Sequence, residues 1–149
     1  MVRDTRYQGA IIRDHHILLI QQRNHRTGCS YWLLPGGGIE GDETEEACVI
    51  REMKEETHLD VRVERLVLDE PLDIDGGYKR RKTYLCRPIA GVAKPGHEPE
   101  PEAAAEYTIV AVRWLDLRDK SGWDESITED PFTFPQLQKL SVLLGTRET

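Results

Sequence analysis

Short apolar runs separated by polar turns predict six β-strands in this chain. Alternating and β-branched apolar residues favour strands because their side chains pack well on a pleated surface. In the fourth run the alternation changes phase, which predicts a slip in that strand. The predicted strands are residues 8–13, 17–23, 31–34, 61–68, 82–89 and 107–115.

A helix is predicted directly after the glycine-rich turn at residues 36–38. Its N-cap is expected at Thr44 or Asp42, whose side-chain oxygens can accept from free backbone N–H groups. Acids in the first turn favour the helix dipole, and here they are Glu45 and Glu46. Apolar spacing along the helix predicts a buried stripe of Ala47, Ile50, Met53 and Thr57.

The order of these elements predicts an α/β fold in which helices cover a mixed sheet. A closing amphipathic helix is predicted at residues 135–144, and residues 91–105 are expected to form a flexible acidic loop because they lack periodicity. Too little chain follows that loop for a second domain. We therefore expect a single domain over residues 1–149.

Composition narrows the class of protein. The 149 residues are 38% hydrophobic and 32% charged, as in ordinary globular proteins. No apolar run approaches the roughly 20 residues that span a bilayer. Three widely spaced cysteines argue against a disulfide framework and favour a reducing cytoplasm. The net charge of −7 argues against broad binding to extended nucleic acid but permits a small phosphorylated substrate.

Three glutamates of the predicted helix share one stripe. At about 100° per residue, Glu52 and Glu56 lie roughly 40° apart, and Glu55 lies within roughly 60° of Glu52. Like charges at this spacing repel, so a neutralising partner is expected. Hard divalent cations such as Mg²⁺ take oxygen ligands of this kind, and Arg51 stands beside the cluster. Outside such a context a solvated face is the usual structure for a Glu-Glu run.

The residues around this cluster resemble the signature box of the Nudix hydrolases. In that box a glycine is followed after five residues by Glu, and after seven more by Arg-Glu-apolar-any-Glu-Glu-any-Gly-apolar. Over 23 residues the matching positions are Gly37, Glu43, Arg51, Glu52, Met53, Glu55, Glu56 and Leu59. One fixed position differs, because His58 stands where the family has glycine. Since His tolerates positive φ better than most residues, we expect His58 to preserve the helix end with slight strain.

The resemblance implies the Nudix fold, an α/β/α sandwich around a mixed β-sheet. It also implies Mg²⁺ or Mn²⁺ as cofactor, with the Gly37 carbonyl, Glu52, Glu55 and Glu56 as ligands. Arg51 and Glu43 would form a supporting pair that orients those carboxylates. Family members take the general base either from the box or from a loop acid. Outside the box the first candidate is Glu106 and the second is Glu102.

Candidate substrate contacts come from several segments. The resemblance points to Arg23 at the end of a strand, and the glycine turn adds Gly36 and Gly37. The basic cluster at 79–82, which includes Arg81, has two equal interpretations: a phosphate site, or a charged hairpin edge that prevents aggregation. Candidate aromatic partners for a base are Tyr31, Trp32 and Tyr78.

The resemblance implies a Mg²⁺-dependent pyrophosphohydrolase. Its substrate would be a nucleoside diphosphate derivative such as a nucleoside triphosphate, an oxidised nucleotide or a dinucleoside polyphosphate. The alternative is a Nudix-fold nucleotide-binding or regulatory module with little hydrolytic activity, motivated by His58. A Nudix-fold isomerase is a third option, although no motif supports it. Either a monomer or a homodimer is compatible with the sequence.

Overall fold

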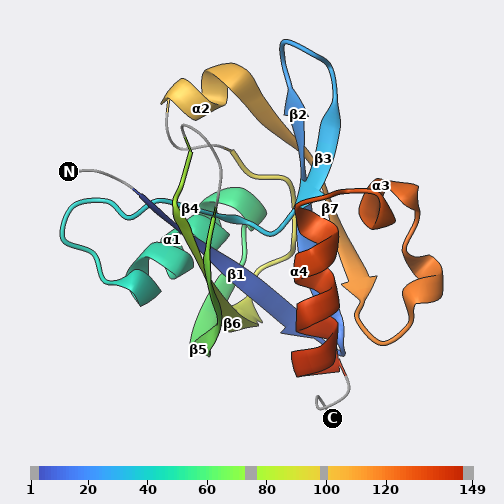
Figure 1. The fold of residues 1–149 in the computed structure, drawn as a ribbon. Helices are drawn as coiled ribbons and strands as arrows, with labels where there is room; N and C mark the ends of the chain where they lie inside the picture. The colour runs from blue at the N-terminus through green and yellow to red at the C-terminus, as the bar shows by residue number, and fades with distance from the viewer. Residues whose placement is uncertain (1–3, 73–76, 98–100, 146–149) are drawn as a thin grey trace.

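The computed structural model describes residues 4–72, 77–97 and 101–145 (Figure 1). All six predicted strands are present; the third is shifted by one residue, and the others are extended by one to four residues. A further two-residue strand, β4, forms inside the glycine turn, where none was predicted. The strands are β1 Thr5–Arg13, β2 His16–Asn24, β3 Ser30–Leu33, β4 Gly36–Gly37, β5 Asp60–Pro71, β6 Arg80–Ala90 and β7 Tyr107–Asp116.

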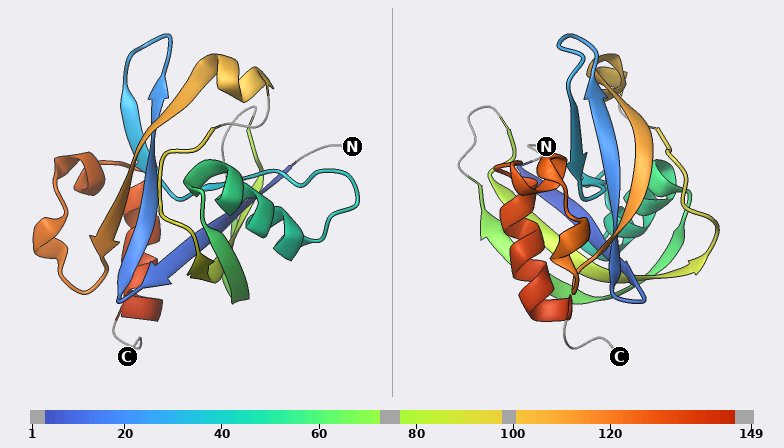
Figure 2. Two further views of the ribbon diagram at one scale, coloured as in Figure 1. Left: turned by 180° about the vertical axis from the view of Figure 1, so that it is seen from behind. Right: turned by 90° about the vertical axis from the view of Figure 1, so that its right-hand side faces the viewer.

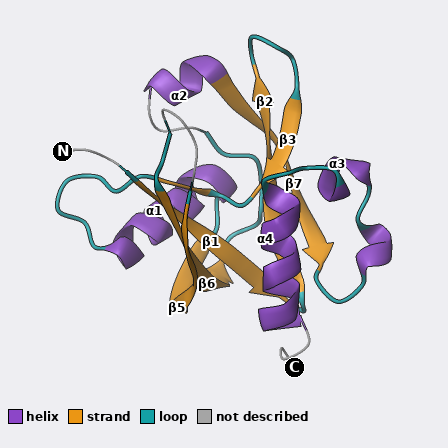
Figure 3. Ribbon diagram, viewed as in Figure 1, coloured by secondary structure: helices purple, strands orange, loops and turns teal. Residues whose placement is uncertain are grey.

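The strands, orange in Figure 3, form one mixed sheet in the order β3-β2-β1-β6-β5, with β4 paired to β1 and β7 paired to β2. Strands β1 and β6 are parallel over Thr5–Ile11, and the other pairs are antiparallel. The register of β5 against β6 shifts between Val63 and Arg65 and again between Leu66 and Leu68. These shifts confirm the predicted slip.

Two helices cover opposite faces of the sheet. They are α1 (Glu45–Thr57) and α4 (Thr133–Leu140), and Figure 2 shows β1 and β6 between them. This arrangement confirms the predicted α/β/α sandwich. The smaller helical elements are α2 Pro101–Glu106, the 3₁₀ turn Lys120–Gly122, α3 Glu125–Thr128 and the π-helical turn Ser141–Gly145, which extends α4. Among the described residues, no helix combines the length and the apolar character needed to cross a bilayer.

Alternation along β1 supplies both cores. Ile11 points into the cluster under α1, while Ala10 and Ile12 point into the cluster under α4. Because successive strand residues face opposite sides of a sheet, an unbroken apolar run is the expected sequence of a strand covered on both faces. Gly9 lies beneath Met53 of α1, and a Cβ there would meet the Met53 sulfur at 2.5 Å. The glycine therefore lets α1 approach the sheet closely.

The buried stripe of α1 differs from the predicted one. Ala47 is exposed and Ile50 is 42% exposed, whereas Glu52 and Glu56 are only 2% and 1% exposed. Met53 and Thr57 are buried as predicted, whereas the predictions for Ala47 and Ile50 are wrong. In the structure the glycine turn covers these glutamates, so the buried positions are Cys48, Val49, Glu52, Met53, Glu56 and Thr57.

Both ends of α1 follow the sequence prediction. The side chain of Thr44 accepts from the N–H of Ala47, so Thr44, and not Asp42, is the N-cap. His58 adopts the left-handed conformation at φ 66° and ψ 11°, and its N–H donates to the carbonyl of Lys54 at 3.1 Å. The metal-binding candidates one turn earlier stay in helical register.

The described parts of the predicted flexible loop, residues 91–97 and 101–105, make ordered backbone contacts. The N–H groups of Lys94, Gly96 and His97 donate to carbonyls of α1, and α2 begins at Pro101. Lack of side-chain periodicity concealed this order, because the segment is held by its backbone. Residues 98–100 and the side chain of Glu102 lie outside the described part of the chain.

Replacing His58 by glycine is expected to stabilise the protein by up to about 1 kcal/mol, because glycine adopts positive φ without a Cβ penalty. Equilibrium unfolding in urea measures this difference. A less stable His58→Gly variant would contradict the strain at this position.

A change in the pH–rate profile of the same variant would assign to His58 the pH-sensitive role that its chemistry permits.

Candidate active site

The glycine turn lies directly on the buried acids of α1. A Cβ on Gly36 would lie 2.4 Å from the Tyr7 carbonyl oxygen, and one on Gly37 would lie 2.3 Å from Oε2 of Glu52. Only glycine fits at either position without displacing its neighbour. The N–H of Gly36 donates to Oε1 of Glu56 at 2.8 Å, which ties the turn to the helix.

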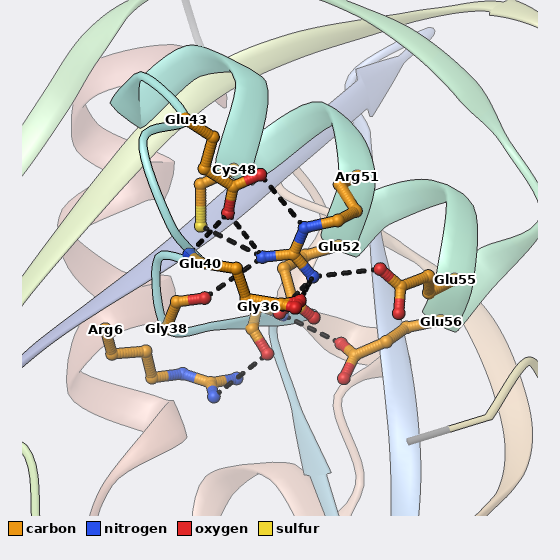
Figure 4. Close-up of polar contacts among 10 residues, drawn as sticks. All are labelled: Arg6, Gly36, Gly38, Glu40, Glu43, Cys48, Arg51, Glu52, Glu55 and Glu56. Carbon is orange, nitrogen blue, oxygen red and sulfur yellow. Dashed lines mark hydrogen bonds and ion pairs between the residues drawn. The ribbon is translucent and has the colours of Figure 1, made fainter. Parts of the chain in front are cut away.

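Arg51 is the centre of the acidic cluster (Figure 4). Its guanidinium donates to both oxygens of Glu43, at 3.1 and 2.6 Å. It also donates to Oε2 of Glu52 at 3.2 Å and to Oε1 of Glu55 at 2.9 Å. A fourth carboxylate, that of Glu40, lies 3.4 Å away. The predicted pairing of Arg51 with Glu43 is thus present, although Glu43 reaches it from the turn before α1 rather than along the helix.

The guanidinium also holds the turn itself, because it donates to the carbonyl of Gly38 at 3.1 Å. The Cys48 sulfur lies 3.8 Å from the same guanidinium. Cys48 is fully buried, and burial raises the pKa of its thiol to about 12. A neutral packing thiol is consistent with these surroundings.

Burial dominates the electrostatics of the site. It raises the pKa of Glu52 to about 7, against the opposing effect of nearby Arg51 and Arg6. In contrast, the hydrogen bonds from Arg51 hold the pKa of Glu43 below its usual value. The same bonds raise the pKa of Arg51 itself, so its charge is permanent. Arg51 thus contacts four carboxylates, and this excess of acid favours the approach of further positive charge.

Arg6 is a site residue that sequence reasoning missed. From β1 it donates to the carbonyls of Leu34 at 2.8 Å and Gly36 at 3.2 Å, on the strand side of the glycine turn (Figure 4). Its Nε donates to the side chain of Gln8 at 3.3 Å. A lone arginine near the N-terminus carries no motif. Only the pairing of β1 with β4 brings it to the turn.

A cavity of about 430 Å³ adjoins the turn at Arg6. Its wall also contains Arg81, whose Nη2 pairs with Glu70 at 2.9 Å and whose buried Nε has no hydrogen-bond partner among the described residues. The floor includes the buried amide of Gln8, which donates to Gln136 at 2.6 Å. The aromatic lining consists of Tyr31, Trp32, Tyr78, Tyr107 and Phe132. All three aromatic candidates from the sequence are thus in one place.

The basic cluster divides in the structure. Arg80 pairs with Asp69 and Lys82 pairs with Glu45, while only Arg81 of the cluster lines the cavity. Strand β6 lies between β1 and β5, so the hairpin-edge interpretation is wrong. The sequence could not exclude an edge because the parallel partner β1 is more than seventy residues away, as the pairing of Thr5 with Arg80 shows.

Two predicted residues lie apart from the acidic cluster. Glu106 ends α2 and lines a second cavity of about 440 Å³ with His25; this cavity adjoins the first at Tyr107. Arg23 is exposed on β2, in register with Ser30 and Thr108, and is not among the residues that line either cavity. Within the described residues, no contact connects either side chain to the carboxylates of α1.

Comparison with known proteins identifies the family. The model of the NUDIX domain matches residues 4–134. The chain belongs to the Nudix hydrolase family. It is 31% identical over 129 residues to a MutT-like protein from Streptomyces ambofaciens, covering 76% of each chain. It is 38% identical over 93 residues to an ADP-ribose pyrophosphatase from Methanocaldococcus jannaschii, covering 60% of this chain and 54% of that relative.

The fold agrees with this assignment. A NUDIX hydrolase structure from Nitrosomonas europaea superposes with a TM-score of 0.72 at 16% identity, over 95% of this chain and 90% of that one. At this identity the likeness concerns the fold alone. Family membership confirms the predicted pyrophosphohydrolase class.

The Nudix box of this chain has the chemistry that a divalent cation requires. Nudix hydrolases generally use such ions, and the buried acids beneath the Gly37 turn offer only oxygen donors, which suit Mg²⁺. In the present arrangement Glu52 and Glu55 face Arg51. Accordingly, no three carboxylate, histidine or thiol side chains among the described residues converge as a preformed ion site. Rotation of these two side chains away from Arg51 would release their oxygens for an ion.

The raised pKa of Glu52 makes stability depend on pH. A carboxyl group whose pKa is higher in the folded state contributes stability below its unfolded pKa, and this contribution is lost as pH rises through the folded pKa. Here that window runs from about 4.3 to about 7. We expect Glu52→Gln to match the parent below this window and to exceed it by roughly 1–3 kcal/mol above it.

Urea unfolding in EDTA across this pH range measures the difference. Glu46→Gln is the matched control, because Glu46 is an exposed acid on the same helix. Parallel stability curves for Glu52→Gln and the parent would contradict the burial effect.

Proposed function

We propose that this Nudix protein is a Mg²⁺- or Mn²⁺-dependent pyrophosphohydrolase that cleaves the diphosphate linkage of a nucleoside diphosphate derivative. One observation carries the proposal: two buried glutamates lie beneath a glycine turn that Arg6 connects to an aromatic cavity. Arg6 spans the two, since it lines the cavity and binds the Gly36 carbonyl, while the N–H of Gly36 binds Glu56. Acids that can bind a metal and a base-sized cavity are therefore two hydrogen bonds apart.

In this proposal, the metal is held by the carbonyl of Gly37 and the carboxylates of Glu52, Glu55 and Glu56. The bound ion would neutralise the non-bridging phosphate oxygens and activate a water molecule. Arg51, fixed by its two bonds to Glu43, sets the resting positions of Glu52 and Glu55. Water attacks a phosphorus of the P–O–P bridge, so a nucleoside triphosphate would yield a monophosphate and pyrophosphate.

The general base comes from a box glutamate or from Glu106 in this scheme. A box glutamate has the advantage of position, because the carboxylates of Glu52 and Glu56 lie against the glycine turn. Glu106 faces a neighbouring cavity that shares Tyr107 with the aromatic one. Its route to the reacting phosphate would therefore pass Tyr107. Arg23 lies on β2 between Gln22, which lines the aromatic cavity, and Asn24, which lines the neighbouring one, so it would contact a substrate that extends beyond the aromatic cavity.

The cavity favours a nucleotide over a simple diphosphate. Aromatic rings such as Trp32 and Tyr78 offer faces on which a base can stack. Arg81 and Arg6 offer donors to phosphate or to base oxygens. The names of the two relatives, a MutT-like protein and an ADP-ribose pyrophosphatase, agree with a nucleotide-derived substrate. The candidate substrates are nucleoside triphosphates, oxidised nucleotides, dinucleoside polyphosphates and ADP-ribose. The proposal also includes a cytoplasmic location.

The alternative is a nucleotide-binding module with little activity, for which the unusual His58 is the motivation. Its observed helix-capping geometry leaves the acidic turn in place and so favours the enzyme. A screen of these substrates for phosphate release, with Mg²⁺ and with EDTA, separates the two functions. Hydrolysis that EDTA abolishes supports the enzyme, whereas nucleotide binding without hydrolysis supports the module.

Glu56→Gln is expected to lower kcat roughly 100-fold or more with folding intact, because the amide keeps the bond to Gly36 but loses the charge that a metal needs. Phosphate release at saturating substrate measures the effect, and circular dichroism checks the fold. The charge-matched control is Glu46→Gln, which should retain activity. Turnover close to that of the parent would refute the assignment of Glu56 as a ligand.

Arg81→Gln is expected to raise KM about tenfold, because a charge-assisted hydrogen bond of about 1.5 kcal/mol is lost from the cavity wall. Glu70 keeps its second partner, Lys139, so the fold should tolerate the change. Arg80→Gln provides the control, since Arg80 pairs with Asp69 outside the cavity. Equal KM values for the two variants would place the substrate elsewhere.

A further inference from the structure

The C-terminal end of α1 is held by a distant segment. The last carbonyls of a helix have no partner within it, so they need donors from elsewhere. Here the donors are three N–H groups of residues 91–97, which we call the strap. Lys94 N–H donates to the carbonyl of Thr57 at 3.0 Å, Gly96 N–H to that of Glu56 at 2.9 Å, and His97 N–H to that of Glu55 at 3.0 Å. In the left view of Figure 2 the yellow chain curves around this helix end.

Two glycines allow the strap to lie so close. A Cβ on Gly96 would stand 1.9 Å from the carbonyl oxygen of Glu55, which no side chain can occupy. Gly91 has φ +95°, and a Cβ there would stand 2.6 Å from the carbonyl oxygen of His58. Between them Ala93 packs against the core cluster under α1. The strap is therefore docked on the helix by backbone contacts and anchored in the core by one methyl group.

Two of the carbonyls that the strap binds belong to Glu55 and Glu56, whose carboxylates are proposed metal ligands. Glu55 and Glu56 stand in the last turn of α1, where helices ordinarily fray. His58 caps that turn in a left-handed conformation that suits glycine better, which adds strain at the same point. Three added hydrogen bonds oppose both effects. Without them, the carboxylates of Glu55 and Glu56 would move with the fraying turn.

We propose that the strap positions Glu55 and Glu56 for metal binding, and that Gly96 is the positioning residue on which the docking depends. The catalytic part of this inference rests on the proposed function, whereas the effect on the helix end does not. Displacement of reacting groups by about 1 Å can cost on the order of 100-fold in rate. Among the described residues that line the aromatic cavity, none belongs to the strap, so loss of the strap should affect turnover and metal use rather than substrate affinity.

Gly96→Ala tests this inference, with Gly122→Ala as the matched control because a Cβ on Gly122 meets nothing within 4 Å. We expect kcat to fall about 10- to 100-fold, KM to change less than about threefold and the half-activating Mg²⁺ concentration to rise. Amide hydrogen exchange should become faster in the strap and in the last turn of α1, while the sheet stays protected. The control should match the parent in every measurement.

Three outcomes would overturn the proposal. The first is a Gly96→Ala variant with unchanged kcat and Mg²⁺ dependence. The second is unchanged amide exchange in the last turn of α1. The third is faster exchange throughout the sheet, with a higher KM and a lower kcat together. The last of these would mean a merely structural role. If Gly96→Ala does not fold, Ala93→Gly takes its place, because it removes the core anchor without a clash. We expect its kcat to fall by a smaller factor than that given for Gly96→Ala, again with little change in KM.

If the parent shows no Mg²⁺-dependent hydrolysis of any substrate, the proposed function fails, but the role of the strap can still be tested. In that case amide exchange at Glu55 and Glu56 and Mg²⁺ binding by calorimetry replace the rate measurements. Faster exchange and weaker Mg²⁺ binding in Gly96→Ala would support the strap. Parent-like values for both would refute it.

Discussion

The contact between the glycine turn and α1 is the constraint on which the rest of the site depends. Gly37 lies so close to Glu52 that any side chain on it would overlap the carboxylate. This contact buries two glutamates that would otherwise be solvated, and burial raises the pKa of Glu52. Burying a charge is costly unless it is paired. The turn therefore creates an electrostatic demand that other groups must meet.

Arg51 meets only part of that demand. A single guanidinium lies among four carboxylates and also holds the Gly38 carbonyl, so it orders the acids without cancelling their charge. A fully neutralised cluster would have little affinity for a cation, and an unpaired one would open the turn. The observed compromise keeps the turn closed while negative charge remains. This balance is the physical reason for linking the site to a divalent ion.

Segments far apart in the sequence fix the helix and the turn in place. From the sheet side, Arg6 of β1 holds the Leu34 and Gly36 carbonyls and extends into the aromatic cavity. From the far end of α1, the strap binds the carbonyls of Glu55 and Glu56. Neither contact involves a recognisable motif. Both bind backbone groups, so neither contact occupies a carboxylate oxygen of the site.

The sequence by itself determined the six longer strands, the capped helix, the layered fold and the group of acids around Arg51, because these depend on local periodicity, capping and spacing. It also predicted the left-handed His58. Tertiary structure decided what depends on contacts between distant segments. The glycine turn reversed the burial of Glu52 and Ile50, parallel pairing with β1 made β6 an internal strand, and backbone bonds ordered the strap. Local pattern carries no information about a partner tens of residues away, and such partners decide which charges are buried.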